Sequence, residues 1–330
     1  MRIGVAGSVA TDHLMSFPGH FKDSLIEGSL ESVSLSFLVD ELVIRRGGCA
    51  ANIAFGLGVL GLNPILIAAV GADWKEYEAW LQRHRVNTDF VHVSNVSHTA
   101  RFLCTTDLDH NQIASFYPGA MSEANLIDLA HVASKSGGLD LIIITPDDPQ
   151  AMINHSEAAR ALGIPFAADP SQQMARMSGE QIKLLIEGAE YLFTNEYESA
   201  LICQKTGWSD ADIASKVNVR ITTHGAKGAT VQRKGAPMVS VGVAHERAKL
   251  DPTGVGDAFR SGFLAGVAAG LADEQSAQLG SMLATYVLET QGTQEYRFNQ
   301  SELHGRLSES YGSTHADEII QALRSTTNFQ

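Results

Sequence analysis

Short apolar segments alternate with longer amphipathic segments along most of the chain. The apolar segments are bounded by Gly, Pro, Asn or Asp, as buried strands usually are, and they cover residues 2–6, 64–70, 139–145, 165–169, 191–194 and 219–223. The amphipathic segments have helical spacing and cover residues 51–60, 74–83, 149–162, 178–187 and 196–205. This alternation is typical of βαβ units, so it predicts an α/β protein with a mostly parallel central sheet.

Two stretches interrupt the alternation. Residues 30–46 and 89–117 contain strand patterns with no helix between them, most clearly at 100–106 and 112–117. We expect these insertions to form a small separate β-sheet that covers a site as a lid. From about residue 256 onward the pattern is helical, over 258–269, 274–288 and 301–323. The whole chain, residues 1–330, is therefore predicted to be a single unit with a lid.

Composition narrows the range of functions. The chain has 330 residues, with Lys+Arg 24 against Asp+Glu 37 and a formal net charge of -13. A surface that binds duplex nucleic acid needs clustered basic residues, so we expect no nucleic-acid partner. The amino terminus lacks the long apolar region of a signal peptide, and the longest later apolar stretch, 263–271, is too short to cross a bilayer. With only three cysteines and no CxxC pair, these features predict a cytoplasmic protein with no membrane partner.

The segment Gly254-Val255-Gly256-Asp257 is the most informative one chemically. Its two glycines allow a tight turn, and a long helical pattern follows directly, so the free amides of residues 254–256 would form an anion hole. Asp257 sits in this turn, where its carboxylate could accept a proton from a hydroxyl. The alternative is an ordinary turn in which Asp257 is only a charge at a helix end.

Common nucleotide-binding motifs do not fit this chain. A GxxxxGK[ST] phosphate-binding loop is absent from the sequence. The glycines after the first predicted strand, Gly4 and Gly7, have the wrong spacing for a dinucleotide fingerprint. A P-loop kinase and a dehydrogenase are therefore excluded as interpretations.

Three more segments place polar groups beside glycines or at helix starts. The first is Gly47-Gly48-Cys49-Ala50-Ala51-Asn52, whose Asn52 offers donors and acceptors to a polyol. The second, 195–198, begins a helix, and the third, Thr223-His224-Gly225-Ala226-Lys227-Gly228, is a glycine turn after a strand. Each has a plainer interpretation as well: Asn52 could be a solvated residue at a helix start, and Asn195 could be only a helix cap.

In this order, the four segments resemble the ribokinase-like (PfkB) carbohydrate kinases over nearly the whole chain. Pro252 and Val255 replace the commoner Thr and Ala of the family signature. The resemblance implies a Rossmann-like three-layer α/β/α fold with a small β-sheet lid, and phosphoryl transfer from ATP to a primary hydroxyl. It implies that Asp257 is the base and that Gly254, Val255 and Gly256 form the anion hole. ATP would be bound by Asn195, Thr223, Gly225 and Gly228, and Glu198 would hold Mg2+ through water. The sequence leaves open whether a monovalent cation is also needed.

Within this family the chain resembles the actinobacterial adenosine kinases, at residues 7–14, 34–40 and 168–173. The likeness implies that adenosine is the nucleoside substrate, phosphorylated to AMP in purine salvage. Asp12, at the end of the first strand, would bind the ribose hydroxyls, with Gly48 and Asn52 nearby. The other implied contacts are a Phe102 and Phe116 sandwich around the purine, amides from Gln172 and Gln173, and lesser contacts from Ser8 and Ser36.

Three alternatives remain open at this point. Phe102 and Phe116 could instead be hydrophobic core, or the seam of a homodimer formed through the lid. The protein could phosphorylate a free sugar such as ribose or a ketohexose. It could also be a catalytically silent nucleoside sensor. The retained Asp257 argues against the sensor, and the aromatic pair with its neighbouring glutamines argues against a free sugar.

Overall fold

The computed structural model describes residues 1–24 and 36–329. Its centre is an eight-stranded sheet in the order β14-β13-β12-β11-β10-β9-β1-β4. Six strands run parallel: β1 (Ile3–Ala6), β4 (Ile65–Ile67), β9 (Leu141–Ile144), β10 (Phe166–Ala168), β11 (Tyr191–Asn195) and β12 (Val219–Thr223). All six predicted strands are confirmed. The antiparallel edge formed by β13 (Ala229–Arg233) and β14 (Val239–Val241) was not predicted.

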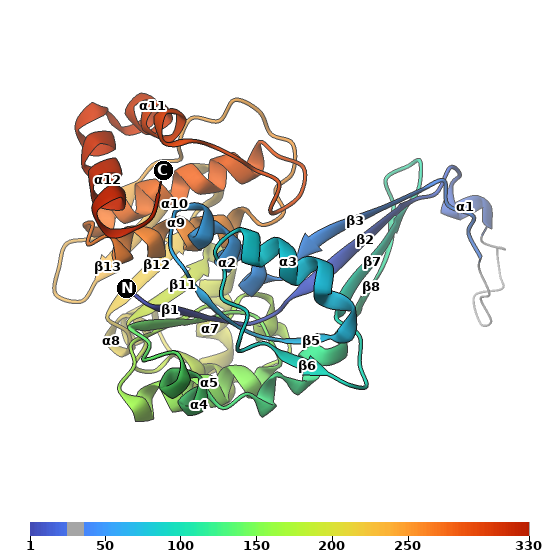
Figure 1. The fold of residues 1–330 in the computed structure, drawn as a ribbon, viewed down its shortest axis with the longest axis horizontal. Helices are drawn as coiled ribbons and strands as arrows, with labels where there is room; N and C mark the ends of the chain where they lie inside the picture. The colour runs from blue at the N-terminus through green and yellow to red at the C-terminus, as the bar shows by residue number, and fades with distance from the viewer. Residues whose placement is uncertain (25–35, 330) are drawn as a thin grey trace.

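Helices cover both faces of this sheet and give three layers (Figure 1). Consecutive residues of one strand point to opposite faces, so Ile143 packs into one core and Ile144 into the other. The first core is covered by α2 (Cys49–Val59), α3 (Lys75–Arg83), α9 (Val255–Ala268), α10 (Asp273–Leu288), α11 (Gln300–Tyr311) and α12 (Ser313–Thr326). The second is covered by α4 (Leu129–Lys135), α5 (Pro149–Leu162), α6 (Gly179–Ile186), α7 (Glu196–Thr206) and α8 (Asp210–Lys216). The predicted three-layer α/β/α fold is confirmed.

One predicted helix was wrong. Residues 301–323 were expected to form a single helix, but α11 ends at Tyr311 and α12 begins at Ser313. Gly312 lies between them with φ 90°, a left-handed conformation that an α-helix does not contain and that glycine adopts readily. The apolar spacing continues through this break, which is why the pattern alone did not reveal it.

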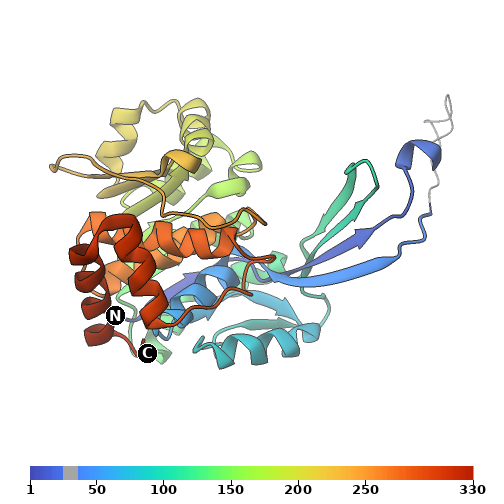
Figure 2. The same ribbon diagram turned by 90° about the horizontal axis from the view of Figure 1, so that it is seen from above.

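A separate four-stranded sheet projects from the body (Figures 1 and 2). Its order is β3-β2-β7-β8, from β2 (Ala10–Ser16), β3 (Glu41–Gly47), β7 (Ala100–Thr106) and β8 (Gln112–Tyr117). The predicted strands at 100–106 and 112–117 are therefore confirmed. β3 overlaps the expected segment 30–46 and ends one residue beyond it, and residues 30–35 of that segment fall outside the described residues.

Two parts of the lid prediction were wrong. The central strand β2 comes from residues just after β1, which were not predicted as a strand. Residues 89–99 do not join this sheet; they contain β6 (His92–Ser94), which pairs with β5 (Ala69–Gly71) beside the body. Single-turn and 3-10 segments complete the described elements: α1 (Phe21–Ser24), η1 (Ala72–Trp74), η2 (Gly119–Leu126), η3 (Ser171–Ala175) and η4 (Gly225–Lys227).

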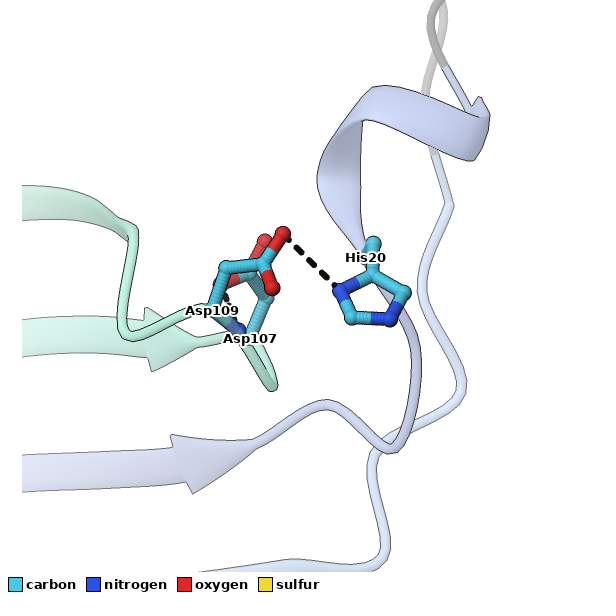
Figure 3. A group of neighbouring side chains, drawn as sticks. All are labelled: His20, Asp107 and Asp109. Carbon is cyan, nitrogen blue, oxygen red and sulfur yellow. Dashed lines mark hydrogen bonds and ion pairs between the residues drawn. The ribbon is translucent and has the colours of Figure 1, made fainter.

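A small polar cluster ties α1 to the outer end of this sheet (Figure 3). His20, Asp107 and Asp109 lie close enough together to suggest a metal site. However, the buried Asp107 carboxylate already accepts four N–H groups, from Phe21, from Asp109 and from the backbone and side chain of Asn111. Lys22 forms an ion pair with Asp109 at 2.9 Å. These contacts therefore indicate that the cluster stabilises the turn at residues 107–111 and its contact with α1.

Within the described residues, no helix is both long enough and apolar enough to span a membrane.

Candidate active site

A cleft of about 1080 Å³ lies between the four-stranded sheet and the carboxyl ends of the central strands. Ligands commonly bind beyond this edge in open α/β sheets. The structure brings most of the predicted site residues together along the cleft: Ser8, Asp12, Gly48, Asn52, Phe102, Phe116, Gln172, Gln173, Asn195, Glu198, Thr223, Gly254, Gly256 and Asp257.

Asp257 lies in the first turn of α9, where the helix opens onto the cleft. Gly254 precedes it with φ 78°, and a Cβ there would lie 2.8 Å from the Thr293 methyl, so both backbone and space require glycine. The bond from Ala258 N to Gly254 O is 2.9 Å long and closes the first helical turn. The amides of Gly256 and Asp257 precede that bond, so they are available to an anion at the positive end of the helix.

The Asp257 carboxylate has a fixed hydrogen-bond donor. Asn52 Nδ2 donates to Asp257 Oδ2 at 2.8 Å. Burial raises the pKa of Asp257 above its ordinary value, while the nearby Arg260 charge and the Asn52 hydrogen bond act to lower it. A half-buried carboxylate with a raised pKa beside an anion hole is the arrangement that a general base requires.

The orientation of Asn52 is set by a chain of side chains that sequence reasoning missed. Trp80 Nε1 donates to Gln294 Oε1 at 3.0 Å, and Gln294 Nε2 donates to Asn52 Oδ1 at 2.9 Å. Because an indole can only donate, it fixes which end of the Gln294 amide faces Asn52. The Thr293 hydroxyl lies 2.8 Å from the same Asn52 oxygen. The Asn52 nitrogen is therefore turned toward Asp257.

Asp12 belongs to β2, so its predicted position at the end of the first strand was wrong. Its neighbours across the sheet are Arg45 on β3 and Phe102 on β7. Burial, followed by repulsion from Asp251, raises the pKa of Asp12 to about 6. The carboxylate lies so close to Gly47 that a Cβ on that glycine would be 3.0 Å from it. Asp12 is thus a partly desolvated acceptor on the cleft side of the sheet.

Phe102 and Phe116 are direct partners across β7 and β8, and both line the cleft. Directly paired residues point to the same face of a sheet, so Asp12, Phe102 and Phe116 form one row. Phe116 is 50% exposed, which rules out the alternative that it is buried core. The row places an acceptor beside two aromatic rings.

The helix α2 meets the first strand through very close backbone contacts. Gly48 has φ 93°, and a Cβ there would be 2.6 Å from the Ser8 carbonyl oxygen. The Ser8 hydroxyl accepts from Cys49 N at 3.1 Å, which caps the helix start. Gln172 and Gln173 approach from η3, and Gln172 Nε2 lies 3.7 Å from the Cys49 sulfur. These residues form the wall between α2 and the end of β10.

Asn195 and Glu198 cap α7 reciprocally. Asn195 Oδ1 accepts from Glu198 N, and Glu198 Oε2 accepts from Asn195 N, both at 2.8 Å. The capping interpretation of Asn195 is thus confirmed, and both residues also line the cleft. The cap uses one oxygen of Glu198, so the second oxygen fits the expected role of holding a metal-bound water.

Thr223 lines the cleft, whereas Gly225 and Gly228 shape the turn behind it. Gly225 has φ 56° and Gly228 has φ 94°, and a Cβ on Gly228 would lie 2.0 Å from Val241 O. His224 points into a different surface groove, where its ring nitrogens contact Glu196 and Thr230 at 2.9 Å.

Besides Gly225 and Gly228, two more predicted residues do not line the cleft. Ser36 is exposed ahead of β3 and does not line the cleft, so its contact with the substrate stays a prediction. Val255 begins α9, and the prediction for it concerned its backbone amide and not its side chain.

An ion pair in the cleft was also missed. Arg260 Nη2 donates to Asp169 Oδ1 at 2.5 Å, and both side chains are buried. Arg260 follows Asp257 by three residues on the same helix, and this spacing is the sequence signal that could have revealed it.

Comparison with known proteins agrees with this geometry. The pattern of the pfkB family carbohydrate kinases matches residues 9–298. A nucleoside kinase of Methanocaldococcus jannaschii is 30% identical over 255 residues, which cover 75% of this chain and 80% of that protein. The solved structure of Burkholderia thailandensis nucleoside kinase in complex with inosine has 34% identity and a TM-score of 0.82, covering 94% of this chain and 97% of that one. A cytidine kinase of Thermococcus kodakarensis is 23% identical over 286 residues, covering 82% of this chain and 97% of that protein.

Proposed function

This chain belongs to the pfkB family of carbohydrate kinases, and on that premise we propose that it transfers the γ-phosphoryl group of ATP to the 5′-hydroxyl of adenosine, giving AMP and ADP. The observation that carries the proposal is the cleft itself. It holds Asp257 at the amino end of α9 on one side and the row of Asp12, Phe102 and Phe116 on the other. Relatives named as nucleoside kinases support a nucleoside as the acceptor.

The row across the four-stranded sheet suits a nucleoside better than a free sugar. Neighbouring strands lie about 4.8 Å apart, so the Asp12 carboxylate and the two rings occupy adjacent positions. A ribose bound through its hydroxyls to Asp12 would place its base against Phe102 and Phe116, where stacking accepts any flat ring. The amides of Gln172 and Gln173 line the same cleft and offer both donors and acceptors to base edges.

The transfer needs a base, an anion site and bound ATP. The 5′-oxygen attacks the γ-phosphorus, the bond from that phosphorus to the bridging oxygen of ADP breaks, and the hydroxyl proton passes to the Asp257 carboxylate. Backbone amides of the turn 254–257 would receive the transferring group; those of Gly256 and Asp257 are available, whereas the Val255 amide donates to Pro252 O at 3.4 Å. Asn195 and Thr223 would hold the rest of ATP, beside the turn that Gly225 and Gly228 shape. Glu198 would hold a magnesium ion through water, and that ion would supply positive charge for the phosphates. Asp257 would be kept in place by the Asn52 hydrogen bond.

We also propose that the protein is a single kinase unit in which the four-stranded sheet acts as a lid, and that it works as a cytoplasmic homodimer. The face of the lid opposite the cleft is apolar and exposed, with Ile44 58% accessible. Its members alternate in sequence with cleft-lining residues and comprise Leu42, Ile44, Leu103 and Ile113. A second copy would cover this face, and a monomer in light scattering would contradict that part of the proposal.

A substrate panel tests the proposed reaction. Release of ADP would be measured with adenosine, guanosine, inosine, cytidine, ribose and fructose in the presence of ATP and magnesium. We expect adenosine to give the highest kcat/KM, with 5′-AMP as the product identified by mass. Another nucleoside in first place would keep the reaction and overturn adenosine as the acceptor. Ribose or fructose in first place would overturn the nucleoside assignment altogether.

A further inference from the structure

Arg260 has no role in the mechanism above, although it lies at its centre. It follows Asp257 by one helical turn on α9 and lines the same cleft. Its side chain is buried, with only 8% of the residue exposed. A buried guanidinium is expensive to desolvate, so each of its donors is expected to have a partner.

The contacts of Arg260 leave part of the guanidinium unpaired. Nη2 donates to Asp169 Oδ1 at 2.5 Å, and Asp169 is only 1% exposed. Among the described residues Nε is buried without any partner. Nη1 lies beside the anion hole, since a Cβ on Gly256 would be 2.9 Å from it. The pair with Asp169 is therefore made through one nitrogen, although a guanidinium can bind a carboxylate through two.

This arrangement is poor for stability and suitable for an incoming anion. A buried ion pair offsets its desolvation only when its remaining donors are satisfied, and that condition fails here. The guanidinium also faces an excess of negative charge, from Asp169 just after β10, Glu198 on α7 and Asp257 on α9. A phosphoryl group entering this region would be repelled by those carboxylates unless a fixed cation stood among them.

We propose that Arg260 is a catalytic residue of the phosphoryl transfer, and that Nη1 contacts an oxygen of the transferring group at the amino end of α9. The inference rests on the proposed kinase function. A planar guanidinium suits this task because it stays charged when buried and matches the geometry of phosphate oxygens. The charge on the transferring group is thereby stabilised from a side that the backbone amides do not cover.

The same charge acts on the base. Burial raises the pKa of Asp257, and the first effect opposing it is the charge of Arg260. Other groups near Asp257 are Asn52 and Cys49 on α2, Tyr296, and the carboxyl group of Asp169. None of these is a cation, so Arg260 is the positive charge among these neighbours that opposes the rise in the pKa of Asp257. Loss of Arg260 would move the acid limb of the rate profile to higher pH.

Four proteins test this role: wild type, Arg260→Met, Arg260→Lys and the control Asp169→Asn. We expect Arg260→Met to lower kcat about 10²- to 10³-fold, the usual cost of removing one preorganised donor at a developing charge. The KM for the nucleoside should stay within about threefold, since the only proposed contact of Arg260 with a substrate is to the phosphoryl group. The acid limb should move to higher pH. Arg260→Lys should recover part of kcat and return the acid limb toward wild type, because it restores the charge without the planar donor.

The control separates chemistry from structure. Asp169→Asn removes the charge of the partner but leaves the guanidinium in place, so kcat should fall much less than in Arg260→Met. If the two variants lose kcat equally, or if Arg260→Met keeps kcat within about threefold with an unmoved acid limb, Arg260 is only a structural partner of Asp169 and the inference is wrong. Should Arg260→Met fail to fold, the double variant Arg260→Met/Asp169→Leu takes its place, because replacing a buried pair by apolar groups is often tolerated. A wild type without kinase activity would contradict the proposed function itself.

Discussion

Individual residues of the cleft are held by partners far away in the sequence. Asn52 accepts from Gln294, which is 242 positions away, and donates to Asp257, which is 205 positions away. Sequence reasoning found Asn52 and Asp257 because each stands beside glycines at a predicted helix start. It could not find Gln294, Thr293 or Trp80, because their roles depend on which distant segments the fold brings together.

Asp12 should be a residue at which binding and stability conflict. Its folded-state pKa of about 6 exceeds the ordinary value of 3.8, so ionising it costs folding free energy. That cost is complete above the folded pKa and absent below the unfolded pKa. Asp12→Asn should therefore raise Tm at about pH 8, and the gain should shrink toward zero at about pH 4.

Nucleoside affinity should change in the opposite direction in Asp12→Asn. The amide has a single acceptor oxygen and no charge, so it cannot accept from two ribose hydroxyls as the carboxylate can. Thermal melts at both pH values and calorimetric titration with adenosine check the two effects. An Asp12→Asn protein that melts below wild type at high pH would show that the carboxylate is a stabilising contact, contrary to this account.

At the scale of elements, the predictable features were those with a regular local pattern. Five of the six parallel strands are nearly continuous apolar runs, as expected when helices cover both faces, and β12 alternates between buried and half-buried residues. The strand β2 was missed because Ala10–Ser16 mixes small, polar and charged residues, and only its partners β3 and β7 fix it as a strand. The edge strands β13 and β14 were missed for a related reason, since short antiparallel edges carry weak apolar signals.

Alternation along β7 provides a matched pair of variants. Phe102 faces the cleft, while Thr105 lies on the opposite face of the same strand. Phe102→Ala should weaken nucleoside binding by about 1–3 kcal/mol, the range for losing one stacking partner, and should leave the KM for ATP nearly unchanged. Thr105→Ala should leave nucleoside affinity as it is. Isothermal titration of both variants with adenosine makes the comparison. An unchanged affinity in Phe102→Ala together with a lower Tm would mean that Phe102 serves packing.

At the scale of the whole molecule, two sheets must meet for the site to exist. The four-stranded sheet, which projects from the body in Figure 2, contributes Asp12 and the aromatic pair, and the body contributes α9 with Asp257. The order of motifs along the chain predicted the three layers and the approximate lid. The meeting of the two sheets around one cleft depends on long-range packing, which no local pattern encodes. Ser36 illustrates this limit, because the prediction placed it by resemblance and the structure leaves it outside the cleft lining.

The most direct measurement is the turnover of Asp257→Asn with saturating ATP and adenosine. Asn keeps the shape of the side chain and is tolerated near a helix amino terminus, so the fold and both substrate affinities should survive. The general base is lost, and kcat should fall by roughly 10²- to 10⁴-fold while the KM values stay close to wild type. A folded Asp257→Asn protein that retains near-normal kcat would contradict the account, because Asp257 would then be only a charge at the start of α9.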